Sequence, residues 1–85
     1  MSGIDYSKLR SVTAREIISA LIKDGFYLDR QSGSHHQFHH HSGRNVTVSF
    51  HRSNDTFSPK MLRSMLEKQA KWTVEDLKRL KLTLL

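Results

Sequence analysis

The 85-residue sequence contains no cysteine, a single proline and no long hydrophobic run. The missing cysteines exclude disulfides, thiolate metal ligands and cysteine nucleophiles. No apolar segment approaches the roughly 18 residues of a membrane helix, and residues 1–5 lack the basic start and apolar centre of a signal peptide. We therefore expect a cytoplasmic protein that does not enter a membrane.

Carboxylates are missing from the middle of the chain. The 25 residues between Asp29 and Asp55 hold Arg30, Arg44, Arg52 and all six histidines, and the whole chain carries a formal charge of +6. A field of that sign attracts polyanions, of which nucleic acid is the most plausible. On charge alone, a basic surface that serves only solubility remains an alternative.

Periodic apolar residues predict one small folded domain of the α+β class. We expect residues 13–85 to form this domain and residues 1–12 an N-terminal arm, in which Ile4, Tyr6 and Leu9 could pack as a short turn. The first expected helix is capped by Thr13 and Glu16 and ended by Gly25, and its apolar face is Ile17, Ile18, Leu21 and Ile22. Strands are expected over 26–31, 35–40 and 45–50. A second helix should begin at Ser58 and Pro59, with Met61, Leu62, Met65 and Leu66 inward, and a short helix should follow Thr73.

Short connections between the strands predict a three-stranded antiparallel sheet in the order α-β-β-β-α, with a short extra C-terminal helix. The helices should cover the face that carries Leu28, Phe38 and Val48. Arg30 is inward by the same alternation. The sheet should leave its other face open.

The turn signal Ser32-Gly33-Ser34 is followed directly by a strand that begins at His35. Because Phe38 must face the core, the two-residue period of a strand places His36 on the core side and His35 on the open face. Three-residue loops at both hairpins would place His35 between Gln31 and His51. We therefore predict a row of Gln31, His35 and His51 across the open face.

An imidazole with a pKa near its ordinary value of ~6.5 can both accept and donate a proton, as RNA cleavage beside a 2′-hydroxyl requires. His35 is the candidate for proton transfer, although an exposed histidine beside a turn can be merely solvated. Cations must hold the phosphate, for which the candidates are Arg30, Arg44 and Arg52. The candidate substrate-binding residues are therefore Arg30, Gly33, Ser34, His51 and Arg52, with Gly33 and Ser34 offering a small anion nest.

A metal site is a second chemical interpretation, because His35, His39 and His51 could share a face and three imidazoles can hold zinc. His35 and His39 are about 13 Å apart along a strand that rises ~3.3 Å per residue. That spacing is too long for a shared ion. We therefore predict no metal and no cofactor.

Four segments of the chain resemble the HicA family of toxins, small mRNA interferases of type II toxin–antitoxin pairs. The resemblance covers roughly residues 13–77 and rests on Asp24-Gly-Phe26, on Arg30-Gln-x-Gly-Ser-His-His-x-Phe38, on Arg44-x-Val-Thr-Val-x-x-His51 and on Leu62-Arg-Ser-Met-Leu66, where x is a position that the resemblance does not use. It implies a fold similar to double-stranded-RNA-binding domains and ribosome-independent cleavage of mRNA. It also implies catalysis by the histidine of the Gly-Ser-His motif, here His35. The partner it implies is a HicB-type antitoxin that blocks this region.

Two interpretations without catalysis remain. A double-stranded-RNA binder would contact phosphates through the first helix, the first hairpin loop and the start of the second helix, and would not need His35. A protein–protein module would simply sequester its partner. Replacing His35 separates the enzyme from both.

Overall fold

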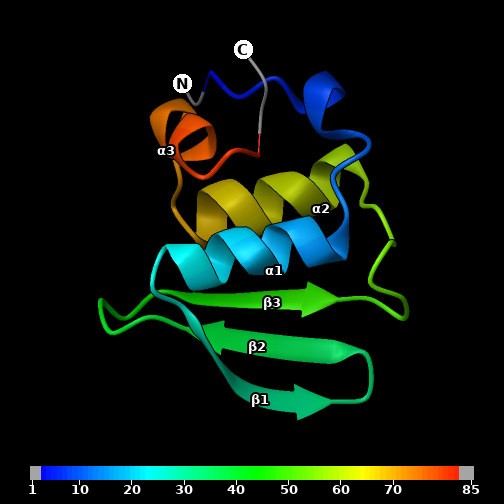
Figure 1. Cartoon of the computed structure of the whole chain (residues 1–85), viewed down its shortest axis with the longest axis vertical. Helices are drawn as coiled ribbons and strands as arrows, with labels where there is room; N and C mark the ends of the chain where they lie inside the picture. Colours follow the sequence, from blue (N-terminus) through cyan, green and yellow to red (C-terminus); the bar gives the residue numbers. More distant parts are fainter. Residues whose placement is uncertain (1–2, 83–85) are drawn as a thin grey trace.

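The structure is a computed structural model, and it describes residues 3–82. Its elements, in order, are η1 (Tyr6–Leu9), α1 (Ala14–Lys23), β1 (Tyr27–Ser32), β2 (His35–His39), β3 (Asn45–Ser49), α2 (Pro59–Arg63), η2 (Ser64–Gln69) and α3 (Val74–Arg79). The segment η2 has π-helical hydrogen bonding and continues α2 (Figure 1). The predicted α+β class, the α-β-β-β-α order and the extra C-terminal helix are confirmed.

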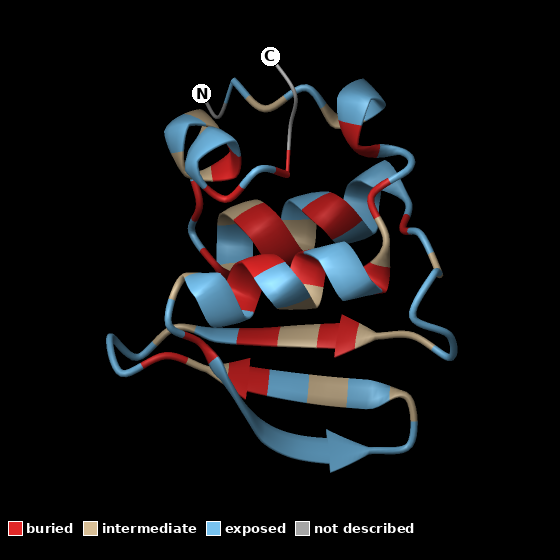
Figure 2. Ribbon diagram, viewed as in Figure 1, coloured by how far each residue is buried: buried red, intermediate tan, exposed pale blue. Residues whose placement is uncertain are grey.

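The three strands form one antiparallel sheet in the order β1-β2-β3. Figure 1 shows β3 nearest to the helices and β1 farthest from them. All six residues of β1 are exposed, and the strand is pale blue along its whole length in Figure 2. The helices therefore bury β2 and β3 in part and leave β1 as an outer ribbon.

The capping box predicted for the first helix is present at the start of α1. The Thr13 hydroxyl accepts a hydrogen bond from the Glu16 N–H at 3.3 Å, and the Glu16 carboxylate accepts one from the Thr13 N–H at 2.9 Å. These bonds satisfy two N–H groups that a helix N-terminus leaves without partners. The helix start is therefore fixed by residues that sequence alone identified.

The core joins the sheet to the helices, and most predicted inward positions are confirmed. Phe38, Val46 and Val48 are buried in the sheet, as are Ile17 and Leu21 in α1. Three predicted inward residues are wrong, since large parts of their side chains are exposed: Ile22 (59%), Leu28 (49%) and Met61 (43%).

These three exposures have simple geometric causes. Ala14 and Ala20, not Ile22, complete the buried stripe of α1, and Ile22 lies about 100° round the helix from Leu21. Leu28 is on β1, the strand farthest from the helices (Figure 1). Met61 precedes the buried Leu62 by one residue, so the two side chains point in different directions.

The register of the first hairpin differs from the prediction. Ser32 pairs with His35 and Gln31 with His36, while Leu28 pairs with Phe38 as expected. The loop is two residues long rather than three, and a β-bulge between Leu28 and Arg30 takes up the extra residue. The prediction that Gln31 lies opposite His35 is therefore wrong.

The second hairpin has a longer connection than predicted, because β2 ends at His39 and β3 begins opposite it at Asn45. Residues 40–44 turn the chain, and the His40 N–H donates to the Arg44 carbonyl at 2.9 Å. Phe38 thus lies opposite Val46 rather than Val48. The pairing of β2 with β3 is shifted by two residues. Because this number is even, each residue lies on its predicted face of the sheet although it pairs with a different partner.

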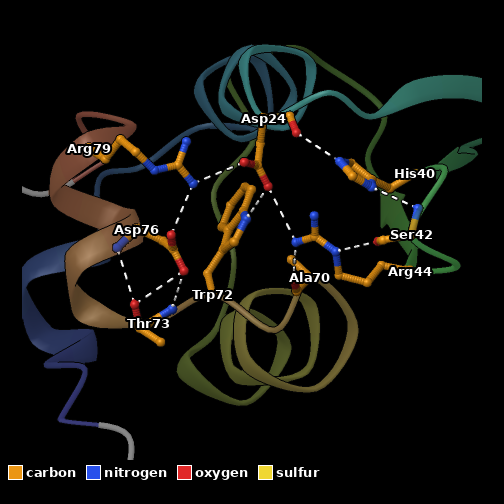
Figure 3. Close-up of polar contacts among 9 residues, drawn as sticks. All are labelled: Asp24, His40, Ser42, Arg44, Ala70, Trp72, Thr73, Asp76 and Arg79. Carbon is orange, nitrogen blue, oxygen red and sulfur yellow. Dashed lines mark hydrogen bonds and ion pairs between the residues drawn. The ribbon is translucent and has the colours of Figure 1, made fainter.

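Asp24 ties the end of α1 to distant parts of the chain (Figure 3). Its carboxylate accepts hydrogen bonds from Arg44 Nη1 at 3.3 Å, from Trp72 Nε1 at 2.8 Å and from Arg79 Nη2 at 2.9 Å. Burial opposes ionisation of this carboxyl, but the bonds from Trp72 and Arg79 and the two positive charges outweigh it, so the pKa of Asp24 lies below its ordinary value.

His40 is buried beside the same network. Its Nδ1 accepts a hydrogen bond from the Ser42 N–H at 3.0 Å, and its Nε2 lies 3.0 Å from the Asp24 carbonyl. A carbonyl only accepts, so the ring donates from Nε2 (Figure 3). Nε2 thus holds the second hairpin to the end of α1, while Nδ1 stabilises the turn within the hairpin.

The segment before α1 packs on the domain. Leu9 is fully buried, Ile4 and Tyr6 pack against the core, and the Tyr6 hydroxyl donates a hydrogen bond to the Glu67 carboxylate. The division into an arm of residues 1–12 and a domain of 13–85 stays a prediction, and positions 1–2 and 83–85 lie outside the described residues. Over residues 3–82, no helix is both long enough and apolar enough to cross a membrane.

Candidate functional site

His35 is the first residue of β2 and follows the turn directly. It is exposed, whereas Phe38 on the other face of the strand is buried. Ser32 of β1 and Ser49 of β3 lie opposite it on the two sides. As predicted, the imidazole therefore stands on the face of the sheet turned away from the core, between two small side chains that leave it accessible.

Arg30 lies on the same face as His35, which corrects the prediction that it points inward. It pairs with Gln37, two residues from His35 along β2. The bulge at Asp29 causes the change, because one extra residue shifts the alternation of every position that follows it in β1. Diagonal neighbours across antiparallel strands have Cβ atoms about 7–8 Å apart, so a guanidinium can reach an anion bound beside the imidazole.

The turn that precedes His35 is held in place by Gly33 and Ser34. Gly33 has a φ of +58°, in the left-handed region, and a Cβ built there would meet no atom within 4 Å. The Ser34 carbonyl accepts a hydrogen bond from the Phe50 N–H at 3.0 Å, which joins the turn to the end of β3. The position of His35 is therefore set by the backbone on both sides of it. The anion nest at Gly33 and Ser34 stays a prediction.

His51 and Arg52 lie in the exposed loop after β3. Both backbone N–H groups donate to the Asp55 carboxylate, at 2.9 Å and 3.1 Å, and these bonds hold the pKa of Asp55 below its ordinary value. The Asp55 carbonyl accepts from the Ala14 N–H at 2.9 Å, which fixes the loop to the start of α1. The predicted row is wrong, because Ser49, not His51, lies opposite His35.

A pocket of about 440 Å³ lies on the core side of the sheet at the hairpin turn, where His51 is found. Its lining residues are Gln31, Gly33, Ser34, His36, Phe50 and His51. The rings of His36 and Phe50 stack with their centroids 4.1 Å apart and their planes 16° from parallel. Alternation along the strand predicts the inward position of His36 but not the pocket, whose only signal in the sequence was two aromatic side chains at the ends of neighbouring strands.

Arg44 has a structural role and is far from His35. Its guanidinium donates to Asp24 and to the Ala70 carbonyl, the latter at 2.8 Å, and lies 4.9 Å from the centre of the Phe26 ring. It sits in the connection between β2 and β3, at the opposite end of the sheet from the first hairpin turn (Figure 1). The suggestion that Arg44 holds phosphate is therefore withdrawn.

Metal-ligating side chains are dispersed in the part of the chain that the structure describes. Within residues 3–82, no three side chains of histidine, aspartate or glutamate lie where they could hold one ion together. His39 contacts Asn45 through Nδ1, and His40 stacks on His41 with centroids 4.4 Å apart. The histidine-rich stretch is thus divided among a strand face, the core and a turn.

The open face combines an accessible imidazole with a guanidinium on the neighbouring strand. An imidazole transfers protons near neutral pH, and a guanidinium binds phosphate oxygens through a planar fork of N–H donors. The arrangement of His35 and Arg30 therefore suits proton transfer next to a bound phosphate.

The sequence profile of a family described as "HicA toxin of bacterial toxin-antitoxin" matches residues 14–72. The matched segment starts at the first residue of α1, contains the whole sheet with His35, and ends before α3. No curated protein matches the chain. Since the profile covers well over half of the sequence, the chain belongs to the HicA family and is the toxin of a toxin–antitoxin pair.

Proposed function

We propose that this toxin is an endoribonuclease that cleaves mRNA without the ribosome and that His35 is its general acid or base. HicA toxins are generally endoribonucleases, which supports the reaction class. The observation that carries the assignment is the exposure of His35 at the start of β2, on the open face and beside Arg30. Of the exposed histidines in residues 3–82, only His35 lies on the strand face beside Arg30.

The reaction requires two proton transfers around one phosphate. A base removes the proton of a ribose 2′-hydroxyl, whose oxygen attacks the adjacent phosphorus. The bond from phosphorus to the 5′-oxygen breaks, and an acid protonates that oxygen. The products are a 2′,3′-cyclic phosphate and a 5′-hydroxyl, and His35 performs one of the two transfers.

Positive charge must hold the phosphate while it gains negative charge in the transition state. Arg30, on the face of His35, supports this role, as does Arg52, which lies on an exposed loop and whose N–H donates to the Asp55 carboxylate. The backbone of Gly33 and Ser34 adds N–H donors beside His35. His51 is assigned to substrate binding on the pocket side rather than to the row beside His35.

The partner we propose is a HicB-type antitoxin that covers the open face. A toxin of this family requires an antitoxin, and β1 offers an outer strand exposed on all six residues beside His35. In the purified complex, hydrogen exchange should be slowed over β1 and β2. Unchanged exchange on these strands would place the antitoxin elsewhere.

Induced expression tests the function in cells, with wild type, His35→Ala and the matched control His39→Ala. His39 is a second histidine on the same face of the same strand. Wild type and His39→Ala should arrest growth and shorten mRNA, and His35→Ala should do neither. Equal arrest by all three proteins, or by none, would remove the catalytic assignment, and arrest without RNA cleavage would favour a binding protein.

Metal independence is tested with purified toxin, ribosome-free RNA and an excess of chelator. Cleavage by an imidazole should continue at the same rate and leave 2′,3′-cyclic phosphate ends. An RNA with one 2′-deoxyribose at the cut site should resist cleavage at that position. Loss of activity in chelator, with recovery on adding a divalent cation, would contradict this part of the proposal.

A further inference from the structure

The pocket of about 440 Å³ opens on the side of the sheet that His35 does not use. Two rings that face the core side of the sheet line it and are only partly covered. His36 and Phe50 are both half-buried. Its volume lies within the roughly 300–1,000 Å³ typical of small-ligand sites.

Only the hairpin turn separates this pocket from His35. Gly33 and Ser34 line the pocket, and the next residue is His35 on the opposite face. Gly33 has no side chain and no neighbour within 4 Å of its Cβ position, so the space beside the turn is open at this residue. A single-stranded RNA whose phosphate lies at His35 therefore has the pocket on the other side of this turn.

The pocket's chemistry is that of a site for a flat, polar ring. The stacked rings of His36 and Phe50 offer aromatic surface, and the exposed Gln31 amide offers both a donor and an acceptor. His36 Nδ1 lies 3.0 Å from the Ser34 carbonyl, which can only accept, so the neutral ring keeps Nε2 as an acceptor. Single-stranded RNA is recognised by this combination of aromatic stacking and hydrogen bonds to base edges.

We propose that the pocket binds one nucleobase of the RNA, next to the phosphate held at His35, and so sets the base preference of cleavage. The inference rests on the proposed function for its substrate, but apart from His51 it uses different residues. An outer face of the stacked His36–Phe50 pair binds the face of the base, Gln31 binds its edge, and His51 closes the side toward the loop. One face of the hairpin would then cleave the RNA, and the other face would select the base.

Binding to the inactive His35→Ala protein tests this without cleavage. The ligands are short single-stranded RNAs, each with one abasic position, and the affinity is measured by fluorescence anisotropy. If wild type cuts an RNA, that sequence is used; otherwise a mixed sequence serves. One abasic position should weaken binding by about fivefold to a hundredfold, the range expected for a stacked base.

The pocket is identified by combining the abasic RNA with a second substitution. Phe50→Leu keeps apolar volume but removes the aromatic ring, so it should abolish most of the affinity loss caused by the abasic position. The control is Ile22→Ala, at an exposed apolar residue on α1, which should leave that affinity loss unchanged. Should Phe50→Leu fail to fold by circular dichroism, the exposed Gln31→Ala carries the test. It should reduce discrimination among the four bases at that position.

An equal penalty at every abasic position would overturn the proposal, as would a penalty that Phe50→Leu and Gln31→Ala leave unchanged. The outcome is separable from that of the proposed function. RNA cleavage that depends on His35, without a base-selective pocket, rejects only the present inference. A selective pocket in a protein that cleaves nothing rejects only the nuclease.

Discussion

Arg30 and Arg44 carry the same charge in the same basic stretch, yet their surroundings give them opposite tasks. Arg30 is exposed and shares the face of His35, whereas Arg44 is bound to Asp24 and to the Ala70 carbonyl at the far end of the sheet. Net charge alone could not separate them. The bulge at Asp29, which turns Arg30 outward, has no signature that we recognised in the sequence.

This difference predicts two separable phenotypes. Arg30→Ala should lower the RNA cleavage rate by about tenfold or more because a phosphate contact is lost, with the melting temperature almost unchanged. Arg44→Ala should lower stability by about 1–2 kcal/mol, roughly 5–10 °C in Tm, with the rate of the folded protein retained. Thermal melting and single-turnover cleavage measure both. Loss of cleavage without loss of stability in Arg44→Ala would show that its assignment is wrong.

For the strands, sequence patterns predicted the face of the sheet on which a residue lies better than the residue with which it pairs. Burial of Phe38, Val46 and Val48 was predicted because alternation depends only on parity. The partner of each residue depends on loop length and bulges, which turn residues such as Gly33 specify only loosely. The second hairpin shifted by two positions, which kept its faces, while the bulge shifted β1 by one and reversed Arg30.

The first hairpin turn should therefore be more critical for activity than the second. Gly33 and Gly43 both have positive φ, +58° and +97°, and neither has an atom within 4 Å of its Cβ position. Alanine at either site should cost about 1 kcal/mol in folding free energy, from the backbone alone. Only Gly33→Ala should also slow RNA cleavage, since it displaces His35. Equal cleavage rates for the two variants, normalised to folded protein, would contradict this role of the turn.

At the scale of the whole molecule, the Asp24 network joins α1, the second hairpin and the segment that leads into α3. Trp72 and Arg79 reach Asp24 from the C-terminal part of the chain, and Arg44 from between β2 and β3 (Figure 3). No local pattern in the sequence indicates this network, because its members are up to 55 residues apart. The small hydrophobic core is thus supplemented by a polar network, in which one partly buried carboxylate accepts hydrogen bonds from three side chains.

Acid should weaken this network. The pKa of Asp24 in the folded protein lies below its ordinary value of 3.8, so its contribution is present above about pH 4 and is lost as the pH falls through the folded-state pKa. Asp24→Asn should lower stability at pH 7 by about 2 kcal/mol, and the gap to wild type should narrow below pH 4. Urea unfolding at several pH values measures this. A gap that stays constant down to pH 2 would contradict it. The carboxyl groups of Asp5, Asp55 and Asp76 also have lowered pKa values, so some acid sensitivity remains in the variant.

The most direct test of the account is the single-turnover cleavage rate of one labelled RNA by purified wild type, His35→Ala and His39→Ala, each shown to be folded by circular dichroism. Loss of a general acid or base should slow the His35→Ala protein by about 10²–10⁴-fold, with His39→Ala within about threefold of wild type. A His35→Ala protein that cuts as fast as the wild type, or a His39→Ala protein that is equally inactive, would contradict the claim that one imidazole beside the first hairpin turn carries the chemistry.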